Sequence, residues 1–273
     1  DLVDGVTKIS EIEGKVIENS KAENIRKLIL ATSKDIRVLL VKIADRLHNM
    51  RTLDFITDEN RKKRIARETM EIYAPLSDRM GMNRIRDELE DLSFQKLNPE
   101  ARNLVVEKLS INKKNRLNNF KEISKKFNII LIDNGVDAKI MGREKTPFSI
   151  WRKMQSKRVS LEQLTDIIGF RVVVDSVATC YKVLGIFHNN WSTIPGRFKD
   201  YISTPKINNY KSIHTSIIGP NKEIVEIQIR TNQMHEFAER GIASHWMYRS
   251  SEKVSHLALK EYDWLRDLVD IME

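Results

Sequence analysis

Apolar residues in the first half of the chain recur every three or four positions, as they do on a helix with one buried side. Five of them open the pattern: Ile36, Leu40, Ile43, Leu47 and Met50. The same period predicts further helices at about 60–80, 83–97 and 99–127. Asn98-Pro99-Glu100 is typical of a helix start, with a capping side chain, a proline in the first turn and then an acid.

The pattern changes near residue 129, where short runs rich in β-branched residues begin. These predicted strands are NIILI (128–132), VDAKIMG (136–142), GFRVVVD (169–175) and EIVEIQIRT (223–231). Helical stretches separate them, at 147–158, 178–191 and 232–248. Strands interleaved with helices predict helices packed on a mixed sheet. We therefore expect an α+β protein with a helical region at 1–128, a sheet domain at 129–250 and a C-terminal helix at 251–273.

Composition narrows the class of protein. The net charge of +9 and the pI near 9.5 favour anionic partners such as nucleotides, nucleic acid or an acidic surface. The single cysteine, Cys180, excludes an internal disulfide framework and fits a reducing cytoplasm. No apolar run is long enough to span a bilayer, and no signal peptide opens the sequence. The start, DLVDGVTKIS, lacks an initiator methionine, so we expect a fragment of a longer protein or a truncated one.

The segment from Gly196 to Thr215, GRFKDYISTPKINNYKSIHT, carries the strongest chemical signal. It places cations, an acid, tyrosine and histidine around a turn, and a strand with a carboxylate follows. Cations neutralise phosphates, a flat ring can stack on a base, and a carboxylate can hold a divalent ion or accept a proton. The segment therefore suits a site for two polyphosphate substrates and a metal. By itself it would also fit a solvated basic connection.

Two other segments suit the same chemistry. In GREKTPFSIWRKM, Arg143, Lys145 and Lys153 could converge on a triphosphate near a helix start, with Ser149 one turn before Lys153. In EIVEIQIRT the alternation puts Glu226 with Gln228 and Arg230 on one side, opposite Val225, Ile227 and Ile229. Asp166 comes just before a buried strand. It could share Mg²⁺ with Glu226 or cap a turn.

In the helical half, Asp45, Asn49 and Thr52 share one helix face. An acid and an amide there could be a metal ligand and its neighbour, but an ordinary solvated face explains the spacing better. We interpret His235 and His245, on the last predicted helix of the sheet domain, as structural.

Taken in order, these blocks resemble the RelA/SpoT homologue family, whose members make and destroy the alarmone (p)ppGpp. The resemblance is carried by GREK…FSIWRKM, the acid before GFR, GRFKDYI…PK…Y.SIHT and EIQIRT, with DGVTK, IADRLHNMRT and YAPLSDRMGM in the first half. It implies a bifunctional long-type member with a synthetase domain related to nucleotidyltransferases. Such a domain moves the β,γ-pyrophosphate of ATP to the 3′-hydroxyl of GDP or GTP.

The resemblance also implies a role for each site residue. ATP would be bound by Arg143, Lys145, Ser149 and Lys153, and the guanine nucleotide by Tyr210, Lys206, His214 and Gln228. Catalysis would fall to Glu226, Asp166, Arg197 and Lys199, with Mg²⁺ held by Asp166 and Glu226. The RFKD sequence at 197–200 looks like the basic version found in bifunctional members. Two residues depart from the family pattern: Phe148 replaces a tyrosine, and Asn209 stands where many members have glycine. Asparagine tolerates left-handed backbone, so the turn should survive.

The helical half resembles the later part of the family's HD-type hydrolase. Asp45 would be the last ligand of a Mn²⁺ site, with Asn49 and Thr52 nearby. We expect the helices that carry the other ligands, and the C-terminal regulatory domains, to lie outside this sequence. We therefore expect Mn²⁺ to bind only if that site were complete, and we expect the hydrolase half to be inactive.

The expected function is ATP:GTP/GDP 3′-pyrophosphotransfer in the cytoplasm, with Mg²⁺, without a membrane and without nucleic acid. Self-association is possible if the helices expose apolar surface. Two alternatives remain. One is a non-catalytic remnant or interaction protein. The other is an RNA-binding module, which only the net charge favours, because stacking aromatics at a recognisable spacing are missing.

Overall fold

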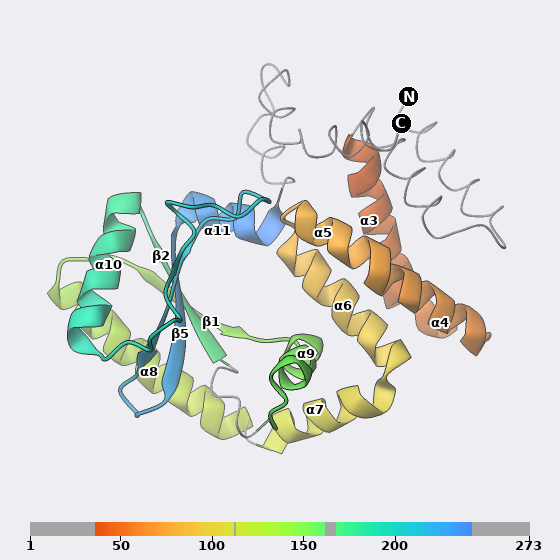
Figure 1. The fold of residues 1–273 in the computed structure, drawn as a ribbon, viewed down its shortest axis with the longest axis horizontal. Helices are drawn as coiled ribbons and strands as arrows, with labels where there is room; N and C mark the ends of the chain where they lie inside the picture. Colours follow the sequence, from red (N-terminus) through yellow and green to blue (C-terminus); the bar gives the residue numbers. More distant parts are fainter. Residues whose placement is uncertain (1–35, 112, 162–167, 242–273) are drawn as a thin grey trace.

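The computed structural model describes residues 36–111, 113–161 and 168–241 (Figure 1). The first part is helical and the second is a mixed sheet with flanking helices, so the expected α+β class is confirmed. The first part runs in the order α3 (Ile36–Arg51), η1 (Leu53–Phe55), α4 (Glu59–Glu68), η2 (Thr69–Tyr73), α5 (Ala74–Arg79), α6 (Asn83–Leu97), α7 (Pro99–Ile111) and α8 (Lys113–Asp133). The second part runs in the order β1 (Lys139–Glu144), α9 (Pro147–Lys157), β2 (Ile168–Val174), α10 (Val177–Asn190), β3 (Lys199–Asp200), β4 (Ile213–Ile218), β5 (Ile224–Thr231) and α11 (Asn232–Arg240).

The helical part is built around α6. The predicted stripe on α3 is confirmed, because Ile43, Leu47 and Met50 are buried in one cluster with Leu89 of α6. Helices α3, α4 and α5 all pack against α6. The segments α4, η2 and α5 follow one another without a break, which matches the helix predicted at 60–80. This packing holds the turn between α5 and α6 at the edge that faces the sheet domain (Figure 1).

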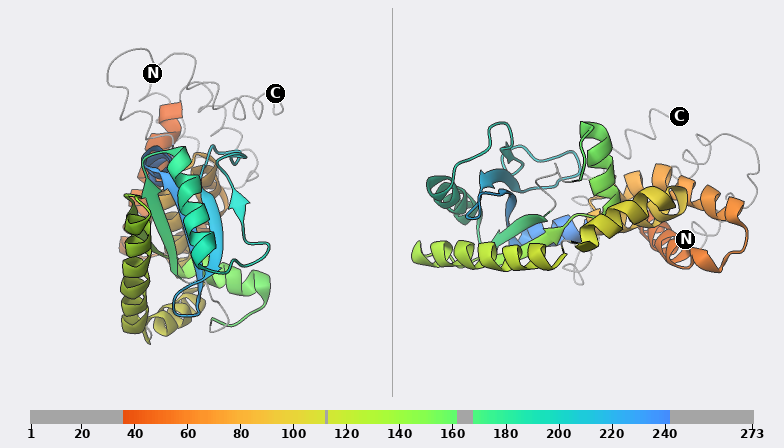
Figure 2. Two further views of the ribbon diagram at one scale, coloured as in Figure 1. Left: turned by 90° about the vertical axis from the view of Figure 1, so that its left-hand side faces the viewer. Right: turned by 90° about the horizontal axis from the view of Figure 1, so that it is seen from below.

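The sheet has the order β1-β2-β5-β4-β3. Strands β2 and β5 are parallel, and the other neighbouring pairs are antiparallel. Helices α8 and α10 cover one face (Figure 2). Phe127, Phe170 and Phe187 form the centre of the core there. Helix α11 packs between the sheet and α6. The second face of the sheet is thereby left for polar side chains.

One predicted strand is wrong. NIILI (128–132) forms the last part of α8, and the helix continues to Asp133. Ile123, Phe127 and Leu131 are four residues apart and fully buried against the sheet. A helical face therefore satisfies the burial that the β-branched run suggested, and tertiary packing overrides local propensity. The domain boundary near 128 stays a prediction, since α8 runs through that position.

Other differences are smaller. The predicted helix at 99–127 is two helices, α7 and α8. Strand β4 was missed because Ile213 and His214 belong to the segment interpreted as a loop. The predicted helix at 232–248 ends at Arg240, where Gly241 has a φ of 57°. The helix expected at 251–273, Asp166 and His245 lie outside the described residues.

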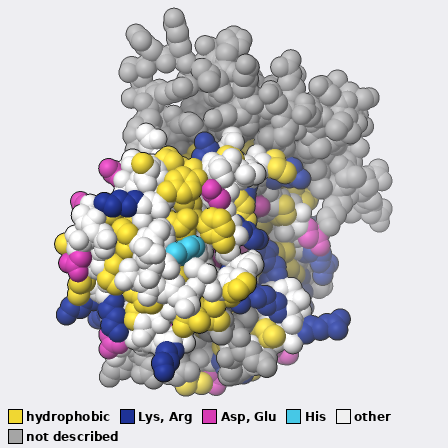
Figure 3. All heavy atoms as spheres, turned by 60° about the vertical axis from the view of Figure 1, so that its left-hand side comes forward, with side chains coloured by type: hydrophobic (Ala, Val, Ile, Leu, Met, Phe, Trp, Pro, Cys, Tyr) yellow, Lys and Arg dark blue, Asp and Glu magenta, His cyan; other side chains and the backbone are white. Residues whose placement is uncertain are grey.

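The surface carries both charge and apolar side chains. On the face seen in Figure 3, Lys and Arg side chains lie in several separate groups with apolar side chains between them. Leu104 and Ile111 of α7 are exposed, at 59% and 73%. Self-association through such residues stays a prediction. Across the described ranges, none of the helices has the length and apolar character needed to cross a bilayer.

Candidate active site

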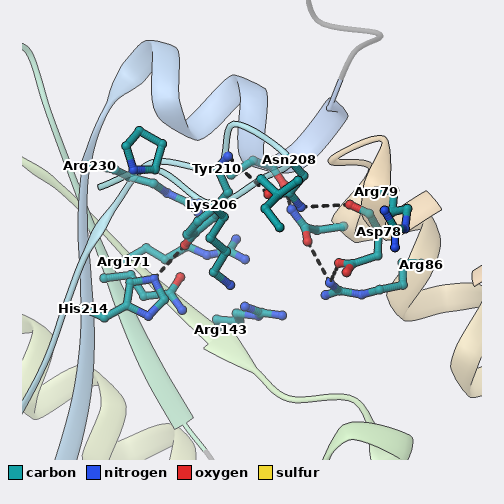
Figure 4. Close-up of a pocket in the computed structure, with 15 residues that line it drawn as sticks. Asp78, Arg79, Arg86, Arg143, Arg171, Lys206, Asn208, Tyr210, His214 and Arg230 are labelled. Carbon is teal, nitrogen blue, oxygen red and sulfur yellow. Dashed lines mark hydrogen bonds and ion pairs between the residues drawn. The ribbon is translucent and has the colours of Figure 1, made fainter. Parts of the chain in front are cut away.

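A cavity of about 580 Å³ lies between the second face of the sheet and the α5–α6 turn (Figure 4). Four parts of the chain line it: the strands, the loop before β4, helix α11 and the helical half. The lining residues are Asp78, Arg79, Asn83, Arg86, Arg143, Arg171, Pro205, Lys206, Ile207, Asn208, Tyr210, His214, Gln228, Arg230 and Ala238.

Positive charge dominates this cavity. Six of its lining residues are cations, against the single carboxylate of Asp78. The cations are Arg79, Arg86, Arg143, Arg171, Lys206 and Arg230. A concave surface lined by one sign of charge concentrates ligands of the opposite sign. The cavity therefore suits a polyanion.

Tyr210 and His214 form the polar corner of the cavity. The Tyr210 hydroxyl and His214 Nε2 are 2.8 Å apart and share a hydrogen bond. Burial lowers the pKa of His214 to about 4, so its ring is neutral at pH 7. Lys206 Nζ lies 5.1 Å from the centre of the Tyr210 ring and 4.9 Å from that of Tyr201. Cation, aromatic rings and imidazole are thus held in one cluster, as the sequence predicted for Tyr210, Lys206 and His214.

A tight turn brings Lys206 and Tyr210 together. The Lys206 N–H donates to the Tyr210 carbonyl at 3.2 Å, and the Asn209 N–H donates to the Lys206 carbonyl at 2.9 Å. Asn209 has a φ of 58°, the left-handed conformation that asparagine tolerates. The expectation that asparagine preserves this turn is confirmed.

Two arginines from neighbouring strands, Arg230 buried and Arg171 half-buried, form the floor. Arg171 of β2 and Arg230 of β5 both pair with Glu239 of α11, at 2.8 and 3.6 Å. Burial lowers the pKa of both side chains, that of Arg230 to about 10, so both remain charged at pH 7. Within the described structure, the Nε atoms of both and Nη2 of Arg230 have no hydrogen-bond acceptor. Because buried donors are normally satisfied, an anionic ligand is a fitting partner for this floor.

The predicted alternation of β5 is confirmed. Val225, Ile227 and Ile229 are buried in the core, and Gln228 and Arg230 line the cavity on the opposite side. Glu226 lies on the same side, where its carboxylate accepts a hydrogen bond from Lys145 Nζ at 3.0 Å. Gly169 of β2 is the register partner of Glu226. The strand that follows Asp166 in sequence therefore runs beside this carboxylate.

The predicted ATP-binding residues are only partly brought together. Arg143 lines the cavity and pairs with Asp87 of α6 at 2.9 Å. Lys145, in the loop after β1, reaches Glu226 instead. Ser149 donates to the carbonyl of Thr146, the N-cap residue of α9. Lys153 follows on α9, and neither it nor Ser149 is among the residues that line the cavity.

The RFKD segment lies at the edge of the sheet. Lys199 of β3 is exposed and is the register partner of His214. Arg197 is half-buried just before β3. Asp200 caps the following turn through bonds from the N–H groups of Ile202 and Ser203. Lys199 thus lies beside His214, and neither Arg197 nor Lys199 lines the cavity itself.

The Asp45 face of α3 is solvent-exposed. The Asn49 side chain donates to the Asp45 carboxylate at 3.2 Å, and the Thr52 hydroxyl bonds to the carbonyl of His48. Among residues 36–111, 113–161 and 168–241, no group of three or more His, Cys, Asp or Glu side chains could hold a metal. In α11, burial lowers the pKa of His235, which suits the structural role expected for it.

The helical half supplies cavity residues that the sequence argument missed. The Asn208 side chain donates to the Asp78 carbonyl at 2.9 Å, and the Asn83 side chain donates to the Ala238 carbonyl at 3.0 Å. These bonds fix the α5–α6 turn, which carries Arg79 and Arg86, against the sheet domain. The segment YAPLSDRMGM (73–82) could have indicated these residues, but the spacing of its side chains suggested no particular chemistry.

The sequence matches two family models. One, described as "Region found in RelA / SpoT proteins", covers residues 142–253, and the other, an HD domain, covers residues 1–83. A GTP pyrophosphokinase rsh of Brucella melitensis is 50% identical over 98% of this chain and 36% of its own length. A guanosine-3′,5′-bis(diphosphate) 3′-pyrophosphohydrolase of Aquifex aeolicus is 47% identical over 100% of this chain and 38% of its own.

The small alarmone synthetase 2 of Bacillus subtilis has a solved structure that is 27% identical, covering 59% of this chain and 92% of that one, with a TM-score of 0.39. The chain thus spans well under half the length of the two curated relatives.

Proposed function

The chain belongs to the RelA/SpoT family, and from this premise we propose that it transfers the β,γ-pyrophosphate of ATP to the 3′-hydroxyl of GTP or GDP, making (p)ppGpp. The observation that carries the proposal is the cationic cavity with the Tyr210–His214 corner at one side. A flat ring beside clustered cations matches a nucleotide, which has a base at one end and phosphates at the other. The reducing cytoplasm favoured by the single cysteine is where such a reaction would take place.

The guanine nucleotide is assigned to the Tyr210 corner. The Tyr210 ring would stack on the base, while Lys206 restricts the ring from its other side. His214 holds the Tyr210 hydroxyl and, being neutral, adds no charge beside the base. Gln228 lines the same corner and has a buried side-chain oxygen that lacks a partner within the described structure. That oxygen could accept a hydrogen bond from a base amino group.

ATP is assigned to the segment from β1 to α9. Arg143 and Lys145 stand before the start of α9, and Lys153 lies one turn after Ser149 along that helix. Charge neutralisation and alignment of the phosphates are the main requirements of phosphoryl chemistry. Lys199, the register partner of His214, and Arg197, just before β3, would supply further positive charge to the transferred group.

Glu226 is proposed as the central carboxylate. Mg²⁺ prefers oxygen ligands, keeps several waters and is commonly bound by one or two carboxylates plus substrate phosphates. Glu226 on β5 fits that donor set, and Asp166 precedes the strand that pairs with it. These two residues would hold the metal, which when bound would neutralise phosphate charge. Glu226 would also accept the proton of the 3′-hydroxyl.

The pair between Lys145 and Glu226 suits this chemistry. When ATP phosphates approach, Lys145 has an alternative anionic partner, and the carboxylate then becomes available to the metal or the hydroxyl. The pair therefore keeps both groups in place before the substrates arrive and costs no large rearrangement when they bind.

The test is a synthesis assay on the purified chain with Mg²⁺, ³²P-labelled ATP and either GDP or GTP, resolved by thin-layer chromatography. We expect labelled tetra- or pentaphosphate product that depends on both nucleotides. A folded chain that makes none would contradict the assignment and favour the non-catalytic alternative. A salt-dependent RNA gel shift in the same preparation tests the RNA-binding alternative.

A further inference from the structure

The helical half brings an arginine into the cavity that the proposed roles leave unused. Arg86 stands in the first turn of α6 and lines the cavity together with Arg143 of β1. The two side chains extend toward each other from opposite walls (Figure 4). The Arg86 side chain is 21% exposed, so it is neither a core residue nor a freely solvated one. Its position is that of a binding group.

Asp87 holds the two guanidinium groups side by side. Its carboxylate accepts bonds from Arg86 at 2.6 and 3.1 Å and from Arg143 at 2.9 Å. Asp87 lines a second cavity of about 440 Å³ and is not among the residues of the larger one. It therefore supports both arginines from the side of the second cavity, and both arginine side chains line the larger one.

Further contacts fix the orientation of Arg86. Its Nη1 atom donates to Asn83 Oδ1 at 2.9 Å and pairs with Asp78. Burial alone would lower the pKa of Arg86, but Asp87 and Asp78 outweigh it and the pKa is raised. A guanidinium held in this way is preorganised, so binding an anion requires little loss of side-chain freedom.

The chemistry of the pair identifies the ligand group. Guanidinium N–H groups are donors that match phosphate oxygens. The bonds to Asp87, Asp78 and Asn83 use Nε and Nη1 of Arg86 and one N–H of Nη2, so Arg86 offers the second N–H of Nη2 to a ligand beside the donors of Arg143. The Tyr210 corner, on the sheet side of the same cavity, is the proposed base site. The Asn208 bond to the Asp78 carbonyl ties the loop that carries Tyr210 to the turn before Arg86. A nucleotide with its base at Tyr210 can therefore extend its phosphates toward α6.

We propose that Arg86 binds the 5′-polyphosphate of the guanine nucleotide and that Asp87 is a positioning residue which sets Arg86 beside Arg143. The inference rests on the proposed function for the identity of the base. The helical half then contributes directly to the synthetase site, and its packing on the sheet is a condition for binding the acceptor nucleotide.

The test compares binding of GTP, GDP and guanosine to the full chain by isothermal titration calorimetry. Arg86→Gln should weaken GTP and GDP by about 10- to 100-fold, the range for losing a hydrogen bond to a charged group, and should leave guanosine unchanged. Arg86→Lys keeps the positive charge and loses the planar guanidinium, so its affinity for GTP and GDP should lie between those of the wild type and Arg86→Gln. Arg64→Gln is the matched control, because Arg64 is an exposed arginine of α4 away from the cavity.

Asp87 is tested by kinetics. Asp87→Asn should raise the KM for GTP and leave kcat near that of the wild type, and Asp87→Glu should restore most of the loss. The KM for ATP should rise as well, because Asp87 also bonds Arg143. Circular dichroism and thermal melts identify any variant that has lost its fold, and the Arg86→Lys protein then serves in place of Arg86→Gln.

The proposal is overturned if Arg86→Gln and Arg86→Lys bind GTP and GDP as the wild type does, or if guanosine is weakened equally. A rise in the KM for ATP alone would also overturn it. Wild-type chain that binds GTP and forms no product would contradict the proposed function and leave the Arg86 measurement valid.

Discussion

Lys145 Nζ donates a hydrogen bond to Glu226 Oε2 over 3.0 Å, which pairs a cation of the β1–α9 loop with a carboxylate of β5. The two residues are 81 positions apart in the sequence. Each was singled out for a different substrate, Lys145 for ATP and Glu226 for the attacking hydroxyl. Their contact therefore marks the point where the two proposed nucleotide sites meet.

Glu226→Gln keeps the size of the side chain and removes its charge. If Glu226 is the base or a metal ligand, synthesis should fall by about 100-fold or more, as measured by initial rates with saturating ATP and GTP. Glu223→Gln is the control, since Glu223 is an exposed acid just before β5. Near wild-type turnover in a folded Glu226→Gln protein would refute the assignment.

Tyr210→Ala should cost about 1–3 kcal/mol of guanine nucleotide binding, the range for stacking of a base on an aromatic ring. Tyr210→Phe keeps the ring and loses the bond to His214, which should cost only about 0.5–1.5 kcal/mol. Calorimetric titration with GDP measures both. If the phenylalanine protein is damaged as much as the alanine protein, the hydroxyl is the important group and stacking is not.

The stability of the fold should fall between pH 6.5 and pH 4 because of His214. Burial lowers its pKa to about 4 in the folded chain, so in this window the unfolded chain binds the proton and the folded chain does not. Urea unfolding at pH 7 and pH 5 measures the loss, and His214→Gln should make it smaller. His48→Gln is the control variant, because His48 is exposed on α3. An unchanged pH dependence in His214→Gln would show that other groups cause it.

Gly241→Ala should weaken the packing of α11 on the α5–α6 turn and lower the melting temperature. Gly241 has a φ of 57°, and a Cβ there would lie 2.6 Å from the carbonyl carbon of Gly81 in the α5–α6 turn. Overpacking of this kind costs about 1–3 kcal/mol, in addition to the backbone strain. Gly135→Ala is the matched control, with a φ of 65° and open space around it. Equal melting temperatures for the two variants would contradict a tight contact at this point.

The 273-residue chain should not hydrolyse ppGpp. Asp45 is exposed and bonded to Asn49, and the resemblance to the family's hydrolase identifies no other Mn²⁺ ligand in this sequence. A single carboxylate cannot fix a metal-bound hydroxide. Pyrophosphate release from ppGpp with Mn²⁺ is the measurement. Activity that disappears in Asp45→Ala would show that another residue completes the site.

Local patterns were enough for some parts of this molecule and not for others. The stripe of α3, the start of α7 and the alternation of β5 follow from periodicity because each depends on one buried face. NIILI was misinterpreted because Phe127 and Leu131 extend that face along a helix. The sequence could not place Arg86 and Asp78 in the cavity. Long-range contacts bring them there, such as the bond between Asn208 and Asp78, which are 130 residues apart.

The central claim is that this chain transfers pyrophosphate to the 3′-hydroxyl of a guanine nucleotide held at Tyr210. The most direct measurement follows AMP and labelled product from ATP labelled at the β-phosphate, in parallel reactions with GTP and with 3′-deoxy-GTP. We predict AMP and labelled guanosine pentaphosphate in equal amounts with GTP, and neither above background with 3′-deoxy-GTP. AMP release without labelled guanosine product, or the same label on both nucleotides, would contradict the account.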